Sequence, residues 1–392
     1  MSTGITYPKG FKTSALNCGL KQSKLDLMIV TSDPPATPAG VFTKNVCCAA
    51  PVILSKNHIN SEKIKAILVN SGNANAATGD EGYANAMKCV EELATRLNCI
   101  PTEILMSSTG IIGVPLQSDK IINSLDVLIK NLSENNDENA AQAILTTDTF
   151  AKKAVCEIEL SGGKIKIGGI AKGSGMIMPD MATMLAFITT DVEIDKHILK
   201  VALKKAVDKS FNRITIDSDT STNDSVIILA NGASNVALTE DDKITFNEAL
   251  ESVCIDLAKM IVRDGEGATK FVAVIAEGCK TENDADKIAR SIANSPLVKT
   301  ALYGCNPNWG RVVAAAGKSG VSFDQNKLDV YFNGVLTVKN GLKANADPKI
   351  LKKEFEKQGI EITVNINSGN SQATIWTCDL SHKYVDINVN YS

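Results

Sequence analysis

The sequence predicts a mixed α/β fold, built from packed layers of strands and helices. Strand-like and helix-like segments alternate along all 392 residues, without internal repeats or low-complexity tracts. The strand candidates are short, rich in β-branched residues and bounded by Gly, Asn, Asp or Ser, whereas several helix candidates begin with a capping signal. At roughly 100–200 residues per domain, a chain of this length is expected to contain two or three domains.

The predicted strands alternate apolar and polar residues or form short apolar runs. They are IKAILVN (64–70), AVCEIEL (154–160), KIKIGGI (164–170), MLAFIT (184–189), SVIILA (225–230), FVAVIA (271–276), LDVYFNG (328–334), EITVNI (361–366), ATIWTC (373–378) and YVDIN (384–388).

Three predicted helices begin at recognisable signals. Asp195 precedes a segment with helical apolar spacing and is expected to cap it. Thr245 and Glu248 have the spacing of a capping box. Asp347-Pro348 matches an N-cap followed by proline in the first turn. Further helices are expected over residues 81–98, 119–131 and 283–294.

A domain boundary is predicted near residue 275. A long helix is expected to end at Gly265, a strand follows, and the polar stretch 278–286 comes next. We therefore expect one domain over residues 1–275 and a second over residues 276–392.

Composition excludes several classes of function. Lys plus Arg total 41 against 44 for Asp plus Glu, and this near balance lacks the basic field of a nucleic-acid-binding protein. The three histidines are scattered and the ten cysteines form no CxxC pair, so we expect no metal site and a reducing compartment. MSTGITYPKGF has no apolar run typical of a signal peptide, and no stretch of about 18 apolar residues follows; we expect a cytoplasmic protein without membrane segments.

Familiar catalytic motifs are missing. GGIAKGS (168–174) has Ser174 where a phosphate-binding loop requires lysine, and neither GxSxG nor a GxGxxG after a strand occurs. One stretch stands out, GGIAKGSGMIMPDMATMLAFITTD (168–191), in which Thr183 opens a predicted strand and Lys172 lies among glycines. From composition alone, a glycine-rich loop leading to a core strand is the favoured interpretation. A threonine at this place is also what an enzyme with an N-terminal nucleophile requires after self-cleavage.

At this stretch the chain resembles the glutamate N-acetyltransferase (ornithine acetyltransferase) family of arginine biosynthesis. The resemblance covers essentially the whole chain in order. It is carried by KGSGMIMPDMATMLAFITTD and by GFKTSALNCGLK, AILVNSGNANAATG, SSTGIIG (107–113), LTTDTFAK (145–152), SFNRITIDSDTSTND (210–224), RDGEGATK (263–270), GCNPNWGRV (304–312) and YVDINVNYS (384–392). In one departure, Ser218 stands where a glycine is expected.

The resemblance implies self-cleavage between Ala182 and Thr183, giving an α-chain of 182 residues and a β-chain of 392 − 182 = 210. The freed α-amine, with an ordinary pKa of about 7.7–8.0, would act as general base for the Thr183 hydroxyl. Thr109 and Gly110 match the family's oxyanion-stabilising pair. The nucleophile would carry the acetyl group from N2-acetylornithine to L-glutamate by a ping-pong mechanism.

Substrate contacts are carried over in the same way. They are Thr149, Lys172, Thr183, Glu266, Asn388 and Ser392. Lys172 is the natural partner of a substrate α-carboxylate, and Glu266 of the cationic amine of ornithine. Without the resemblance, Lys172 would be a surface lysine and Glu266 a solvated carboxylate at a helix end.

The resemblance further implies an αββα sandwich with a smaller C-terminal α/β domain, and an α2β2 assembly of the cleaved chains. No cofactor is expected, and some family members accept acetyl-CoA as donor. Two alternatives stay open: a self-processing aminopeptidase or amidase that passes the acyl group to water, and a processed but inactive binding protein. GCNPNWGRV and RDGEGATK favour the acetyltransferase over the first, and intact Thr183, Thr109, Gly110 and Lys172 argue against the second.

Overall fold

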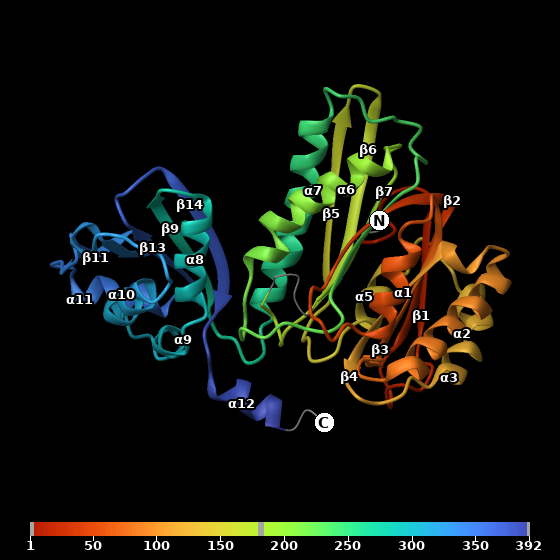
Figure 1. The fold of residues 1–392 in the computed structure, drawn as a ribbon, viewed down its shortest axis with the longest axis horizontal. Helices are drawn as coiled ribbons and strands as arrows, with labels where there is room; N and C mark the ends of the chain where they lie inside the picture. Colours follow the sequence, from red (N-terminus) through yellow and green to blue (C-terminus); the bar gives the residue numbers. More distant parts are fainter. Residues whose placement is uncertain (1–3, 179–183, 390–392) are drawn as a thin grey trace. The chain divides into compact units, whose positions relative to one another are not determined.

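A computed structural model describes residues 4–178 and 184–389 (Figure 1). The chain divides into two compact units. Unit 1 comprises residues 1–212 and 219–261, and unit 2 comprises residues 213–218 and 262–392. The predicted boundary at 275 lies 13 residues beyond this division, inside a central strand of unit 2, because helix α7 (Lys243–Arg263) ends before that strand begins.

Unit 1 is built around one long strand, β2 (Leu27–Phe42), which belongs to two sheet segments. Its first part pairs with β1 (Phe11–Leu16) and β3 (Ile64–Asn73), and its second part pairs with β8 (Ser225–Ala230). The order is β4-β3-β2-β8-β7-β6-β5, with β1 attached to β2. The remaining strands are β4 (Ile104–Ile111), β5 (Lys152–Leu160), β6 (Gly163–Lys172) and β7 (Leu185–Thr190).

The two sheet segments of unit 1 stack face to face. Alternate strand residues point to opposite faces of a sheet, so one face of each segment can enter a shared core. Val30 and Ile67 of the first segment belong to one buried cluster with Phe187 and Ile227 of the second. Burying such side chains stabilises the fold by about 1.5–3 kcal/mol each.

Helices cover the two outer faces. On the first segment, α1 (Ala50–His58) and α2 (Gly79–Leu97) pack against the residues that alternate with the shared core, such as Leu68. On the second segment, α6 (Lys196–Lys209) and α7 cover the outer face, where Leu257 of α7 faces Gly169 of β6. The expected αββα sandwich is therefore confirmed. Smaller helices are α3 (Ser118–Ile122), α4 (Leu125–Lys130) and α5 (Asp137–Ala143).

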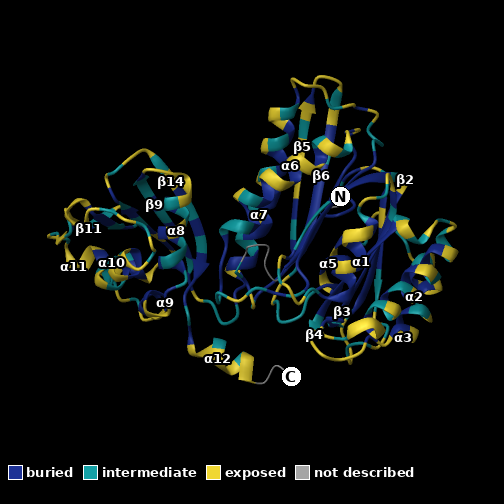
Figure 2. Cartoon of the chain, viewed as in Figure 1, coloured by how far each residue is buried: buried dark blue, intermediate teal, exposed yellow. Residues whose placement is uncertain are grey.

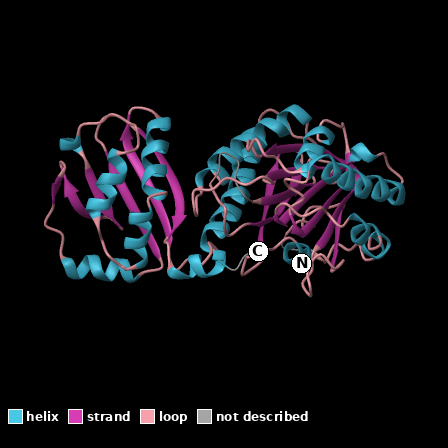
Figure 3. Cartoon of the chain, turned by 60° about the horizontal axis from the view of Figure 1, so that its bottom comes forward, coloured by secondary structure: helices cyan, strands magenta, loops and turns pink. Residues whose placement is uncertain are grey.

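Unit 2 contains a six-stranded sheet of order β12-β11-β10-β13-β9-β14. Its strands are β9 (Phe271–Cys279), β10 (Asp329–Phe332), β11 (Val335–Lys339), β12 (Leu342–Lys343), β13 (Gly359–Asn365) and β14 (Ser371–Cys378). Its helices are α8 (Glu282–Ala293), α9 (Pro296–Tyr303), α10 (Trp309–Gly317), α11 (Pro348–Glu356) and α12 (His382–Val389). Figure 3 shows helices packed against the strands of this sheet, and the residues that face the helices form one buried cluster. In Figure 2 the strands β9 and β14 carry buried and intermediate residues.

The predicted capping signals have mixed outcomes. Asp195 accepts hydrogen bonds from two backbone N–H groups of α6, and Asp347 accepts one from Lys349, as expected. The Thr245 prediction is wrong, because α7 already begins at Lys243. The single helix expected over 119–131 is two short helices, α3 and α4, separated by a turn at residues 123–124.

The strand prediction at 384–388 is also wrong: this segment lies in α12. An apolar alternation over so few residues does not distinguish a strand from an exposed helix. Tyr384 donates its N–H to Ser381 O, and the Asn388 side-chain amide reaches Tyr384 O, which lies four residues back on the same side of the helix. Within the described ranges 4–178 and 184–389, no helix is both long and apolar enough to cross a membrane.

Candidate active site

Thr109 and Gly110 lie near the end of β4, which runs parallel to β3. Gly110 has φ 136°, and a Cβ there would lie 2.4 Å from the carbonyl carbon of Gly72. Both facts require glycine, because backbone atoms cannot move aside as a flexible side chain can. The close approach of β4 to the backbone of β3 therefore fixes glycine at position 110, directly after the buried Thr109.

Lys172, the last residue of β6, is buried beside this pair. Its Nζ donates to Thr109 Oγ1 at 3.3 Å and to Thr146 Oγ1 at 2.8 Å. A threonine hydroxyl that accepts from an ammonium keeps its own hydrogen for donation elsewhere. Lys172 thus leaves Thr109 oriented as a donor, and the interpretation of Lys172 as a surface lysine is wrong, since its side chain is 5% exposed.

Asp148 neutralises this lysine, and the sequence analysis did not select it. Its carboxylate lies 3.9 Å from Lys172 Nζ and 2.7 Å from Lys152 Nζ, and it also accepts the Gly173 N–H at 2.6 Å. Burial alone would raise the pKa of Asp148, but the two lysines and these hydrogen bonds hold that pKa well below its ordinary range. A fully ionised Asp148 therefore anchors both lysines. Asp148 lies in LTTDTFAK (145–152), one of the segments that carry the family resemblance.

The loop that carries Asp148 is tied down at its start by Lys21. The Lys21 Nζ donates to Leu145 O at 2.6 Å and to Leu25 O at 3.2 Å. Burial lowers the pKa of Lys21 to about 8, although Asp26 opposes this shift. Lys21 is a second group in this region that the sequence analysis did not select. Of the expected substrate contacts, Thr149 is exposed at the end of the same loop.

Ala182, Thr183 and Ser392 lie outside the described residues. The chain is described again from Met184, whose N–H donates to Asp224 Oδ1 at 2.8 Å. Asp224 is buried directly before β8, the parallel neighbour of β7.

In unit 2 the structure brings together two residues that are 122 positions apart. The Asn388 side-chain amide donates to Glu266 Oε2 at 2.7 Å. Gly267 follows with φ 69°, and its carbonyl accepts a hydrogen bond from the hydroxyl of the buried Ser381, which directly precedes α12. The expected substrate contacts therefore fall into two groups, with Thr149 and Lys172 in unit 1 and Glu266 and Asn388 in unit 2.

Ser218, where a glycine was expected, has φ 70°. This left-handed conformation costs a residue with a Cβ roughly 1–2 kcal/mol. Serine at this position therefore strains the turn, because the backbone keeps a left-handed conformation that glycine adopts without cost.

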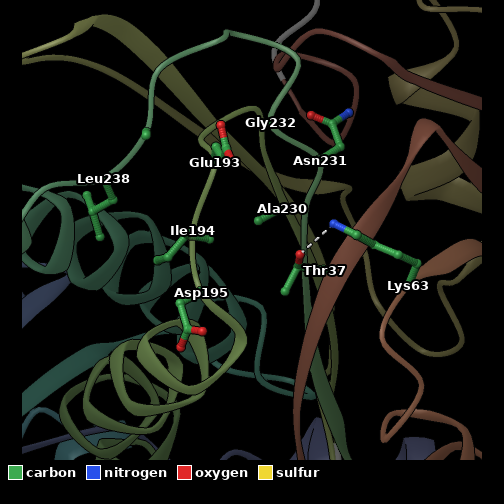
Figure 4. A pocket seen from close by; sticks show the side chains of 10 residues that line it. Thr37, Lys63, Glu193, Ile194, Asp195, Ala230, Asn231, Gly232 and Leu238 are labelled. Carbon is green, nitrogen blue, oxygen red and sulfur yellow. Dashed lines mark hydrogen bonds between the residues drawn. The ribbon is translucent and has the colours of Figure 1, made fainter.

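A cavity of about 390 Å³ opens elsewhere in unit 1 (Figure 4). Lys63 donates to Thr37 across it, and Glu193, Asp195 and Asn231 contribute to its polar walls. None of the expected site residues that the structure describes lines it. Over residues 4–178 and 184–389 no group of three or more His, Cys, Asp or Glu side chains has the arrangement to hold a metal ion.

The αββα sandwich thus carries Thr109, Gly110 and the buried Lys172 in one region of unit 1, a fold and a set of polar residues typical of an acyl-transferring enzyme. Comparison with known proteins assigns the family. A sequence model of the ArgJ family matches residues 12–392, and the chain belongs to that family. "Arginine biosynthesis bifunctional protein ArgJ" of Chlorobaculum tepidum is 47% identical over 100% of this chain and 97% of its own length.

Two further similarities agree with this membership. "Glutamate N-acetyltransferase" of Methanocaldococcus jannaschii is 46% identical over 99% of this chain and 98% of its own length. The crystal structure of arginine biosynthesis bifunctional protein ArgJ from Bacillus halodurans is 40% identical with a TM-score of 0.50. It covers 52% of this chain and 97% of the solved chain.

Proposed function

We propose that this chain is a glutamate N-acetyltransferase of arginine biosynthesis that moves acetyl from N2-acetylornithine to L-glutamate. The observation that carries the proposal is the Lys172–Thr109 contact beside Gly110, on a chain that aligns end to end with relatives of this name. Developing negative charge on the acetyl oxygen would receive the Thr109 hydroxyl and the Gly110 N–H. Removing one such donor typically costs roughly 3–4 kcal/mol of transition-state stabilisation.

The reaction has two balanced halves. Thr183 Oγ attacks the acetyl carbonyl carbon while its proton passes to the α-amine of Thr183. The carbon–nitrogen bond to ornithine then breaks, the ornithine amine takes that proton, and an acetyl-threonine ester remains. The glutamate amine then attacks the ester carbonyl carbon and gives a proton to the α-amine of Thr183. The ester carbon–oxygen bond breaks, Thr183 Oγ takes that proton from the α-amine, and N-acetylglutamate leaves.

This mechanism needs a free α-amine on Thr183, so the proposal includes self-cleavage after Ala182. The length of the solved Bacillus halodurans chain supports it, because nearly all of that chain matches only 52% of this one. The expected β-chain of 210 residues is slightly more than half of 392. Intact mass spectrometry of the purified protein tests the cleavage. Two fragments with a new N-terminus at Thr183 are expected, and a stable 41.7 kDa species would contradict it.

In this proposal, charged residues of the enzyme select the substrates by pairing with substrate groups of opposite charge. Lys172 is the candidate partner of a substrate α-carboxylate, and its contact with Thr109 gives it a second role at the donor pair. Glu266, held by Asn388, is the candidate partner of the ornithine amine. KM for each substrate in Lys172→Ala and Glu266→Ala tests this assignment; an unchanged KM in both variants would overturn it.

Initial-rate kinetics separate the transferase from a hydrolase. Parallel double-reciprocal lines and glutamate-dependent consumption of acetylornithine are expected. Equal consumption with and without glutamate would favour the hydrolase, and an absent acetyl-Thr183 peptide after donor incubation would favour a non-catalytic protein. Replacing acetylornithine by acetyl-CoA in the same assay decides whether this chain is bifunctional.

The proposal also includes the cofactor requirement, the cellular location and the assembly of the protein. The enzyme requires no cofactor, acts in the cytoplasm and assembles as an α2β2 heterotetramer of its own cleavage products. A light-scattering mass of about twice 41.7 kDa is expected for this assembly, and a mass of one chain would exclude it.

A further inference from the structure

Asn223, which lies two residues before β8, has a buried side-chain amide that the preceding reaction scheme leaves unused. The residue is 6% exposed, and its amide donates to Ser108 O at 2.8 Å and to Ala74 O at 2.7 Å. Both partners are backbone carbonyl oxygens, which only accept hydrogen bonds, so the atom that faces them is the amide nitrogen. An asparagine amide carries two hydrogens, and Asn223 therefore gives both of them to these two carbonyls.

The two carbonyls belong to the two chain segments that meet at Gly110. Ser108 lies on β4 directly before Thr109, and Ala74 directly follows β3. The Ala74 N–H donates to Ile111 O at 2.9 Å, which ties the two segments together after Gly110. The Asn223 amide ties the same segments together before Thr109. The backbone that carries Thr109 and Gly110 is thus held at both of its ends.

The Ser108 carbonyl controls the orientation of Thr109, because the two residues share one peptide unit. A peptide bond is planar, so the Ser108 carbonyl group lies in one plane with the N–H and the Cα of Thr109. A hydrogen bond from Asn223 to that oxygen limits the rotation of this plane, and with it the direction in which the Thr109 side chain leaves the backbone. Lys172 donates to the hydroxyl of the same side chain at 3.3 Å. Thr109 is therefore held at its main chain by Asn223 and at its hydroxyl by Lys172.

The segment before β8 holds Asn223 itself in place. Its N–H donates to Ser221 Oγ at 3.1 Å, and its carbonyl accepts from Ser225 Oγ at 3.2 Å. Its Oδ1 accepts the hydroxyl hydrogen of Thr222, whose carbonyl accepts the Ala49 N–H. All polar atoms of Asn223 thus have partners, as a rigid support requires. In the sheet order β2 and β3 separate β8 from β4, so Asn223 makes a link that strand pairing does not provide.

We propose that Asn223 is a positioning residue for the transfer reaction, which fixes the main chain of Thr109 through the Ser108 carbonyl. This inference rests on the proposed function, in which Thr109 donates to the oxyanion. Asn223 acts through Thr109 and makes no bond to substrate in this scheme. Misplacing a catalytic group by about 1 Å can lower a rate roughly 10²-fold, so this support matters for the transition state and not for the binding of substrate.

The test is Asn223→Leu, which keeps a similar volume and removes the donor. The variant leaves Lys172 and Glu266, the candidate partners of substrate charges, unchanged. Therefore kcat and kcat/KM should fall together, roughly 10- to 100-fold, while KM for acetylornithine stays within about twofold. Rates are divided by the amount of cleaved chain, measured by intact mass.

The matched control is Asn231→Leu. Asn231 is also 6% exposed, directly follows β8 at its other end, and donates its side-chain amide to Lys9 O at 2.9 Å. Its replacement should lower the melting temperature, because a buried carbonyl loses its partner, and should leave kcat at the wild-type value.

A double variant separates positioning from a general loss of stability. In the Thr109→Val background, the hydroxyl that Asn223 helps to orient is missing. Asn223→Leu should therefore lower kcat much less in this background than in the wild type, since two residues that act through one interaction are not additive. A combined loss equal to the product of the two single losses would show that Asn223 acts independently of Thr109 and would overturn the inference.

The outcomes also separate this inference from the proposed function. A wild type that transfers no acetyl group overturns the proposed function and this inference with it. If the wild type is active, a wild-type kcat in Asn223→Leu overturns the inference alone, and so does an equal loss of kcat in Asn231→Leu. Should Asn223→Leu fail to fold or to cleave, Asn223→Ser, which keeps one donor, is measured. A kcat lowered roughly 3- to 10-fold is then expected, and an unchanged kcat refutes the positioning.

Discussion

Replacing Asp148 by asparagine removes a carboxylate that holds two buried lysines while leaving the shape of the side chain nearly unchanged. The side chains of Asp148 and Lys152 are 0% exposed and that of Lys172 is 5% exposed, so water cannot take over the lost interactions. Breaking a buried ion pair by removing one partner costs roughly 3–5 kcal/mol, because the other charge stays buried. For a unit of this size that corresponds to a fall in melting temperature of roughly 6–20 °C.

The assay is thermal unfolding followed by circular dichroism at several pH values. The pKa of Asp148 is depressed in the folded chain, so its stabilising effect is complete above the ordinary aspartate pKa of about 3.9 and is lost as the pH falls below it. The difference in melting temperature between the wild type and Asp148→Asn should therefore be largest at pH 6–8 and should decrease below about pH 4.

The control is Asp119→Asn, which breaks an exposed pair with Lys88 of similar length, 2.8 Å. Exposed ion pairs contribute little to the free energy of unfolding, so this variant should have the same melting temperature as the wild type. A melting temperature of Asp148→Asn equal to that of the control at pH 7 would refute the reasoning. The double variant with Lys152→Met should recover part of the loss, since it removes one of the two stranded charges.

Three more predictions concern the donor pair and the strained turn. Thr109→Val should lower kcat roughly 10²–10³-fold, while its melting temperature should stay within a few degrees of the wild type. Thr109→Ser keeps the hydroxyl and should retain most activity. A wild-type steady-state rate in Thr109→Val would show that Thr109 does not stabilise the oxyanion. Gly110→Ala should destabilise unit 1 by at least about 1–3 kcal/mol and abolish transfer, whereas Gly317→Ala, where a Cβ meets nothing within 4 Å, should be tolerated in the same melts. Ser218→Gly should stabilise the protein by roughly 0.5–1 kcal/mol, because the relief of left-handed strain exceeds the added chain entropy; denaturant titration showing a loss instead would contradict this.

The strands that the sequence predicts best are those buried on both faces. SVIILA has the same bounds in the structure, Ser225–Ala230, and every one of its residues is buried. Strand β2 was missed because Pro34, Pro35 and Pro38 interrupt its pattern, and proline normally excludes a central strand. The structure tolerates Pro34 and Pro35 where the β2–β3 register is irregular, between Thr31 and Ala36. Long-range pairing of this kind leaves no local signal.

The residues of the candidate site also divide into those that the sequence predicted and one that it did not. The resemblance selected Thr109, Gly110 and Lys172, whose proximity the structure supports. It did not select Asp148, because the need for a carboxylate there arises from tertiary pairing. In the register of β5 and β6, Lys152 lies opposite Ala171, which brings Lys152 close to Lys172. Only this juxtaposition of two buried lysines makes a neighbouring carboxylate necessary.

The buried charges around the donor pair favour an anion. Lys152 and Lys172 contribute two positive charges, and Asp148 contributes one negative charge. Burial raises the pKa of Asp224 well above its ordinary value. Under the proposed mechanism, Lys172 would lie beside the oxyanion that forms at Thr109, and its charge would favour the transition state over the neutral acetyl group that precedes it.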